Sequence, residues 1–120
     1  MPLAEITADN IAANSTVNQL AGNRIEFINP QVVRAQVRVM AVASAVALQH
    51  EMFIGPRNPI IRGGVSVSAT PNDLIDPDNV VLAGANANPG ERLVLNTIET
   101  AGVATNDYRA RVLVREGWRG

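Results

Sequence analysis

The chain has no cysteine, which excludes disulfide bonds, thiolate nucleophiles and cysteine-ligated metal sites. Its single histidine, His50, also excludes a metal site built from several histidines. A catalytic triad would need a serine beside His50, and no nucleophile-elbow motif surrounds any of the serines, which are Ser15, Ser44, Ser66 and Ser68. These absences predict a protein that is not an enzyme and that uses no cofactor and no metal.

Aromatic side chains and lysine are scarce too. The aromatic residues are Phe27, Phe53, Tyr108 and Trp118, and all ten basic residues are arginine. A core with so few aromatics must be built from Val, Ile, Leu and Ala, which is typical of thin β layers. The ten arginines are balanced by eleven acidic residues to a net charge of −1. We therefore expect no general attraction to nucleic acid or to membranes.

Long apolar runs are also missing. No window approaches the roughly 18 consecutive apolar residues that a membrane span requires. Residues 1–5 lack the basic region and apolar run of a secretion signal, so none is expected. The length of 120 residues is typical of a single domain.

What the sequence does contain is alternation, and it is clearest at residues 31–44. One face of this stretch carries Val33, Ala35, Val37, Val39 and Ala41, and the other carries Val32, Arg34, Gln36, Arg38 and Met40. A period of two indicates a strand with one dry face and one mostly polar face. Arginines on one face argue against a parallel strand that is buried on both sides. An antiparallel sheet lying over a core is therefore predicted.

Shorter segments follow the same pattern and predict the rest of the fold. Further strands are expected at residues 24–28, 45–54, 60–61, 65–69, 80–82, 92–98 and 107–115, with loops rich in Gly, Pro and Asn at 55–59, 70–79 and 83–90. The alanine-rich run 41–49 would also permit a helix, but its alternation favours a strand. Seven or eight short strands predict one antiparallel β-sandwich over residues 24–120, of jelly-roll or immunoglobulin-like topology. The side chains expected in its core are Val37, Val39, Leu93, Leu95, Val112 and Val114.

Residues 1–23 differ from the rest because they are rich in Ala, Asn and Thr and carry only scattered apolar side chains. Their spacing permits a weak helix, capped at Thr7, but not one that is stable alone. We interpret the segment as an extended N-terminal arm that becomes ordered against a partner. The alternative is a frayed terminus.

Arginines supply the candidate site. Arg34 and Arg38 share the polar face of one predicted strand, and Arg109, Arg111 and Arg115 share that of another. If both strands belong to one sheet, five guanidiniums cover a single surface. Interleaved aromatics and a net positive charge, which nucleic-acid binding favours, are lacking. Docking against an acidic protein surface fits better, because the arginine fork pairs well with carboxylates. The alternative is a solvated face balanced by local glutamates.

Two other groups of residues have ordinary interpretations. His50 lies on an otherwise apolar strand face, so we expect a partly buried, hydrogen-bonded histidine rather than a catalytic one. Asp73, Asp76 and Asp78 crowd one loop, and such carboxylates can ligate calcium. Their spacing does not match an EF-hand, and Asp beside proline is an ordinary turn former. Calcium binding by this loop stays open, and no metal site is predicted.

Four segments carry a resemblance to a known class of proteins. They are Q-L-A-G-N-R-I-E-F at 19–27, V-R-A-Q-V-R-V at 33–39, P-N-D-L-I-D-P-D-N-V at 71–80 and P-G-E-R-L-V-L-N-T at 89–97. With them, residues 19–114 resemble small β-sandwich proteins of bacteriophage particles. The resemblance implies a structural virion protein, made in the host cytoplasm and placed on the capsid surface as a minor capsid, cement or decoration protein. It also implies binding to the major capsid protein or another virion protein and assembly as a homo-oligomer, with a trimer favoured. No catalytic or cofactor residues come with it.

A carbohydrate-binding or adhesive β-sandwich module is the alternative function. Such modules usually present exposed aromatics on which sugars stack, and Trp118 is the one plausible candidate. They are also usually secreted.

Overall fold

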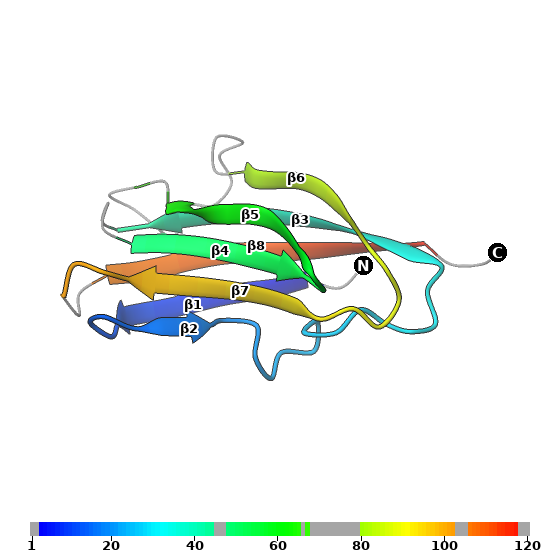
Figure 1. Ribbon diagram of the computed structural model, residues 1–120, viewed down its shortest axis with the longest axis horizontal. Coiled ribbons are helices and arrows are strands. Elements are labelled where there is room, and N and C mark those ends of the chain that lie inside the picture. Colours follow the sequence, from blue (N-terminus) through cyan, green and yellow to red (C-terminus); the bar gives the residue numbers. More distant parts are fainter. Residues whose placement is uncertain (1–2, 45–47, 66, 68–79, 103–105, 118–120) are drawn as a thin grey trace.

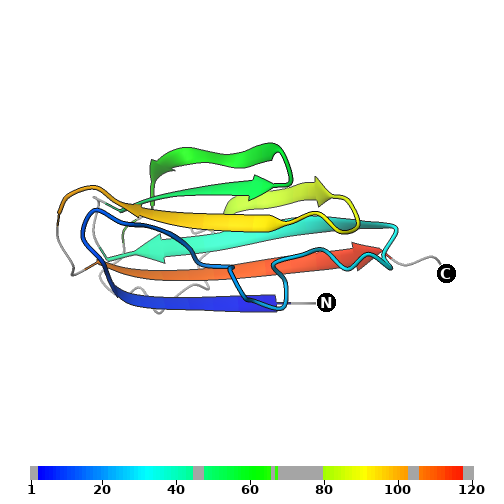
Figure 2. The ribbon, with the colours of Figure 1, turned by 60° about the horizontal axis from the view of Figure 1, so that its bottom comes forward.

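The computed structural model describes residues 3–44, 48–65, 67, 80–102 and 106–117. Within these residues the chain forms eight β-strands and no helix. The strands make two antiparallel sheets of four strands each, and Figures 1 and 2 show one sheet lying over the other. The predicted all-β, antiparallel class is confirmed.

Each sheet takes its strands from both halves of the chain. Sheet A has the order β1 (Leu3–Ile11), β8 (Asn106–Gly117), β3 (Arg34–Ala43) and β6 (Val80–Ala87), and sheet B has the order β2 (Thr16–Asn18), β7 (Leu93–Glu99), β4 (Leu48–Ile54) and β5 (Arg57–Gly64). Consecutive strands lie in different sheets except for the β4–β5 hairpin. The two layers are therefore joined by crossing connections at both ends.

The core lies between the two sheets and follows the alternation of the sequence. The six side chains expected there are all buried, namely Val37, Val39, Leu93, Leu95, Val112 and Val114. Strand β4 behaves in the same way and turns Leu48, Met52 and Ile54 inward. Because successive side chains of a strand point to opposite sides, each inward row leaves an outward row on the surface.

The N-terminal segment is not an arm, and it is not helical. Leu3–Ile11 is strand β1, paired antiparallel with β8 from Leu3 opposite Leu113 to Ile11 opposite Asn106. Ile6 and Ile11 are buried in the common core. The interpretation of residues 1–23 as a separate arm is therefore wrong for β1 and β2, and the sheets begin at residue 3. Its apolar residues looked scattered because Ala and Thr occupy several positions of the strand.

The predicted strand at 24–28 is also wrong. In the described structure this segment lies in a loop, with one isolated bridge between Phe27 and Arg92. The loop leads from β2 in sheet B to β3 in sheet A and buries Leu20, Ile25 and Ile28. Its apolar spacing therefore reflects a loop packed on the core rather than a strand.

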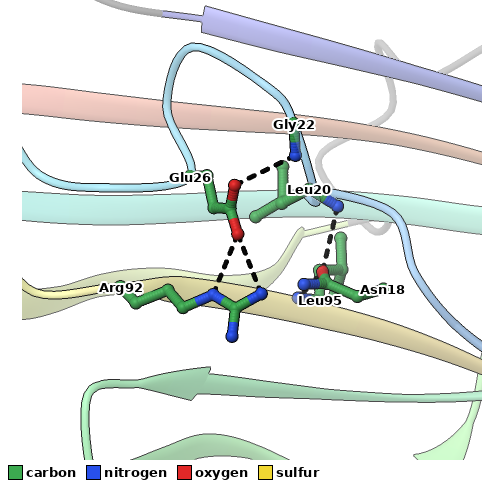
Figure 3. Close-up of polar contacts among 6 residues, drawn as sticks. All are labelled: Asn18, Leu20, Gly22, Glu26, Arg92 and Leu95. Carbon is green, nitrogen blue, oxygen red and sulfur yellow. Dashed lines mark hydrogen bonds and ion pairs between the residues drawn. The ribbon is translucent and has the colours of Figure 1, made fainter.

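Side chains fasten this loop to β7, as Figure 3 shows. The Glu26 carboxylate accepts a hydrogen bond from the Gly22 backbone N–H (3.0 Å) and from Arg92 Nε (2.9 Å). The Gly22 N–H holds the pKa of Glu26 below its usual value, and Arg92 adds to this effect, while desolvation acts the other way. Asn18 Oδ1 accepts from the N–H groups of Leu20 (3.0 Å) and Leu95 (3.2 Å).

Two predicted loops contain strands. Strand β5 begins at Arg57 and runs through Pro59, after a turn at Gly55 whose φ of 57° suits glycine. Proline is tolerated there because β5 is an edge strand, which leaves one row of backbone groups without a ladder partner. Residues 83–87 belong to β6, because pairing with β3 uses the backbone and does not require large side chains.

The remaining predictions fall partly or wholly outside the described residues. Of the strand expected at 65–69, Val65 donates its N–H to Leu48 O and Val67 forms an isolated parallel bridge with Ala43. Residues 45–47, the loop 70–79 with Asp73, Asp76 and Asp78, and Trp118 are not described.

Candidate docking surface

The arginines lie on the outer face of sheet A. Strands β3 and β8 are antiparallel neighbours, paired from Arg34 opposite Gly117 to Ala43 opposite Tyr108. Their inward positions are taken by buried side chains such as Val37 and Val112, so the alternate positions face outward. All five candidate arginines occupy these outward positions, and they are Arg34, Arg38, Arg109, Arg111 and Arg115. The condition on which the candidate surface depended, one common sheet, is met.

Two of these arginines are paired with acids of β1. Arg109 Nη2 lies 2.7 Å from Asp9 Oδ1, and Arg111 Nε lies 3.4 Å from Glu5 Oε1. The second contact is an ion pair without a hydrogen bond, because Arg111 Nε has no aligned acceptor. Both acids belong to the segment that was interpreted as an arm, so these ion pairs were not predicted from the sequence. The alternative interpretation, a face whose charge is balanced by nearby acids, therefore holds for Arg109 and Arg111.

The other three arginines form a separate group. Arg115 lies opposite Gln36, and Arg34 and Arg38 flank Gln36 on β3. Diagonal neighbours on a sheet are about 7–8 Å apart between Cα atoms, within reach of arginine side chains. All three are exposed, and none makes a hydrogen bond or ion pair with the residues that the structure describes. We call Arg34, Arg38 and Arg115 the unpaired arginine cluster.

Aliphatic surface adjoins the cluster. Leu113 lies opposite Arg38 on this face and is half-buried. On the other side of β3, the exposed Asn86 of β6 lies opposite Gln36. The surface thus combines guanidiniums with aliphatic and amide groups, and such a combination suits a protein partner.

His50 is placed as the sequence predicted. It is buried between the sheets, and its Nδ1 lies 3.2 Å from the hydroxyl oxygen of Tyr108 on β8. The two rings meet edge to face, with centroids 6.1 Å apart. Burial lowers the pKa of His50 and raises the pKa of Tyr108. Both side chains are therefore neutral at neutral pH and join the two sheets.

Sequence reasoning missed a buried acid at one end of the molecule. Glu99 is 2% exposed, and its carboxylate accepts hydrogen bonds from the backbone N–H groups of Asn14 (2.7 Å), Ala101 (2.8 Å) and Gly102 (3.1 Å). It therefore ties the β1–β2 turn to the segment that follows β7. The signal was available, since Glu99 continues the inward row of Leu93, Leu95 and Thr97.

Asn106 is the second buried polar residue at this end. Its side chain is fully buried, and its amide oxygen and nitrogen find no hydrogen-bond partner among the described residues. No group of three or more acidic or histidine side chains in the described part of the chain is arranged to hold a metal ion. None of the described segments is a helix long and apolar enough to cross a membrane.

Comparison with known protein families and with curated proteins finds no match to this chain. The function must therefore be argued from the strand order and from the outer face of sheet A.

Proposed function

We propose that the protein is a jelly-roll β-sandwich and a structural, non-catalytic component of a bacteriophage particle, where it binds and stabilises the capsid shell as a cement, decoration or minor capsid protein. The observation that carries the proposal is the strand pairing. β1 pairs with β8, β2 with β7, β3 with β6 and β4 with β5, and these pairs alternate between sheets A and B. A long antiparallel hairpin rolled into two layers would have this order.

Among sandwich topologies, this order favours the jelly roll. An immunoglobulin-like sandwich has strand orders A-B-E-D and C-F-G, which do not match two sheets of four strands with this pairing. Jelly rolls of eight strands occur in viral capsid proteins, in lectins and in cupins. A fold alone does not define a function, so the choice among these must come from the residues.

The residues favour the structural role over the other two. A cupin site requires several histidine ligands, and this chain has one histidine, which is occupied with Tyr108 in the core. Sugar-binding modules usually present several exposed aromatics. Of the four aromatic residues in this sequence, Tyr108 is buried, Phe53 is half-buried and Phe27 is exposed on a loop. The resemblance of residues 19–114 to phage particle proteins points the same way.

Self-association is part of the proposal. β6 is an outer strand of sheet A, and its sequence, VVLAGANA, contains no charge and no proline. The other outer strand of sheet A, β1, carries Glu5 and Asp9, and the edge strand β5 contains Pro59. Two register shifts against β3 and a hydrogen bond from Arg57 Nη1 to Asn86 O interrupt the β6 edge, but its own residues supply neither charge nor proline, and such edges readily pair with another chain. A closed ring is the usual outcome, and a trimer would match the threefold positions of a shell.

Particle composition tests the proposal directly. Mass spectrometry of purified phage particles from the source culture is expected to detect this chain in a fixed ratio to the major capsid protein. Light scattering of the purified chain is expected to give the mass of a trimer. Particles that lack the chain would contradict the virion role, and a monomer at micromolar concentration would contradict the oligomer.

A further inference from the structure

The five arginines of sheet A fall into two sets with different surroundings. Arg109 and Arg111 face acids that the neighbouring strand β1 supplies. The unpaired arginine cluster lies on the same face, on β3 and at the C-terminal end of β8, and the described part of the chain supplies no ion-pairing acid to it. The face is therefore balanced on one side and leaves positive charge without a partner on the other.

We infer that the unpaired arginine cluster binds an acidic segment of a protein partner. The carboxylates of this segment pair with Arg34, Arg38 and Arg115 in the way that Glu5 pairs with Arg111 and Asp9 pairs with Arg109. This names the partner chemistry of the proposed docking surface, and it rests on the proposed function.

The β1–β8 contact shows how such recognition works in this molecule. Glu5 and Asp9 are four residues apart on an extended strand, so they point to the same side and reach two arginines of the next strand. Arg34 and Arg38 have the same spacing on β3, which corresponds to about 13 Å along a strand. Arg115 lies between them on β8. An extended segment with acids at every second or fourth position would match this arrangement.

A protein carboxylate explains the cluster better than a phosphate backbone does. Nucleic-acid surfaces usually combine a net positive charge with aromatic side chains that stack on bases. This chain has a net charge of −1, and the described residues next to the cluster include Gln36, Leu113 and Asn86. Aliphatic side chains beside guanidiniums allow apolar burial together with ion pairing, and the arginine fork can hold a carboxylate through two hydrogen bonds.

Matched arginine variants test the inference. In the test variant, Arg34→Gln and Arg38→Gln remove two charges from the cluster. In the control variant, Arg24→Gln and Arg62→Gln remove two charges from exposed positions outside sheet A. A third variant, Arg34→Lys with Arg38→Lys, keeps the charge but removes the planar fork. Thermal unfolding of all three is measured first, so that any change in binding is compared between folded proteins.

The probe is a short synthetic peptide of alternating Glu and Ser, labelled for fluorescence anisotropy and titrated at low ionic strength. We expect the peptide to bind the natural protein and the control equally, and the test variant at least about tenfold more weakly. The lysine variant should fall between them. A peptide in which Gln replaces Glu should not bind. The inference is overturned if the natural protein does not bind the acidic peptide, or if the test and control variants bind it equally.

A single-stranded oligothymidylate of similar length is titrated in parallel. Tighter binding of this oligonucleotide than of the peptide, lost in the test variant, would assign the cluster to nucleic acid and overturn the inference. Failure of this inference can also be distinguished from failure of the proposed function. Particles that contain the chain, and that take up the test and control variants equally, would leave the virion role standing and remove the role of the cluster.

Discussion

The outer faces of the two sheets differ in how their polar groups are used. On sheet B the polar side chains bond to one another, with Asn96 Nδ2 donating to Glu51 Oε1 (3.1 Å) and Arg62 Nε donating to Gln49 Oε1 (2.9 Å). Ile98, opposite Gln49 on β7, is only 5% exposed although its position faces outward. On sheet A two arginines are paired with acids, and the other three make no ion pair with any residue that the structure describes. The polar side chains of these two pairs on sheet B bond to each other, whereas sheet A leaves three exposed guanidiniums without an ion pair to the described residues.

The difference does not come from the architecture, because both sheets are antiparallel and both alternate between inward and outward residues. It comes from which side chains occupy the outward rows. Backbone pairing decides which residues face outward. The identity of those side chains decides whether they bond to one another or leave charge exposed to the solvent. The following experiments test the inner and outer assignments on which this comparison depends.

Deleting residues 1–20 should have the largest effect. The deletion removes β1 and β2, one outer strand of each sheet, together with the buried side chains of Ile6, Ile11 and Leu20. Burial of three such side chains contributes about 5–9 kcal/mol, comparable to the total stability of a domain at about 5–15 kcal/mol. We expect no cooperative thermal transition by circular dichroism. A truncated protein with the melting temperature of the full chain would restore the arm interpretation and break the comparison.

A charge on the inner face of sheet A should have the next largest effect. Val37 is fully buried, and Val37→Asp would place an unpaired carboxylate between the sheets. We expect the free energy of unfolding to fall by about 4 kcal/mol or more in urea titrations. The matched control is Gln36→Asp, one residue away on the outer face, which should change stability by about 0.5 kcal/mol or less. Equal effects would mean that the two faces of β3 were assigned wrongly.

Two glutamates of sheet B give the corresponding test for that sheet. In Glu99→Gln the buried side chain loses one of the two oxygens that accept backbone N–H groups, and we expect a loss of about 2–3 kcal/mol. Glu51→Gln on the outer face keeps an acceptor for Asn96 and should cost about 0.5 kcal/mol or less. Guanidinium unfolding of both variants measures the difference. A smaller loss for Glu99→Gln than for Glu51→Gln would contradict the buried role of Glu99.

The buried His50 predicts a pH dependence. Because burial lowers its pKa in the folded state, the unfolded chain takes up a proton first as the pH falls below about 6.5. Stability from this group should therefore fall with decreasing pH, by at most about 1.4 kcal/mol per pH unit, until the folded-state pKa is reached. Urea titrations of the natural protein and of His50→Gln across this range isolate the effect. Parallel stability curves for the two proteins would show that His50 does not cause it.

The smallest effect should separate the paired from the unpaired arginines. Arg109→Gln removes the 2.7 Å ion pair with Asp9 and should cost about 0.5–1 kcal/mol. Arg115→Gln removes a charge with no acidic partner in the described structure, so stability should be unchanged or slightly raised. Thermal unfolding at low and high salt measures both. A larger loss for Arg115→Gln would mean that this arginine is already paired within the molecule.

The strands that the sequence predicted well are those with large aliphatic side chains at alternate positions. Val37, Val39, Leu93, Leu95, Val112 and Val114 marked β3, β7 and β8, and all of them are buried. The strands it missed in whole or in part have weaker signals. β1, which was missed, alternates through Ala and Thr. β6 was predicted only at 80–82 because the rest of it consists of small residues, and β5 only at 60–61 because it contains a proline. β1 and β6 become strands because β8 and β3 supply the hydrogen bonds, and these partners lie far away in the sequence. β5 instead pairs with the preceding strand β4 in a hairpin, which tolerates the proline because β5 lies at the sheet edge.

The candidate site was likewise predicted in part from the sequence. The sequence showed that Arg34 and Arg38 share one side of a strand and that Arg109, Arg111 and Arg115 share one side of another, because a period of two is a local property of the backbone. Whether the two strands are neighbours, and which arginines meet an acid, depended on the register of β8 with β3 and with β1. Pairing between residues about a hundred positions apart, such as Glu5 with Arg111, leaves no local pattern. Which residues pair is decided only by the packed core, which brings both ends of the chain into one sheet.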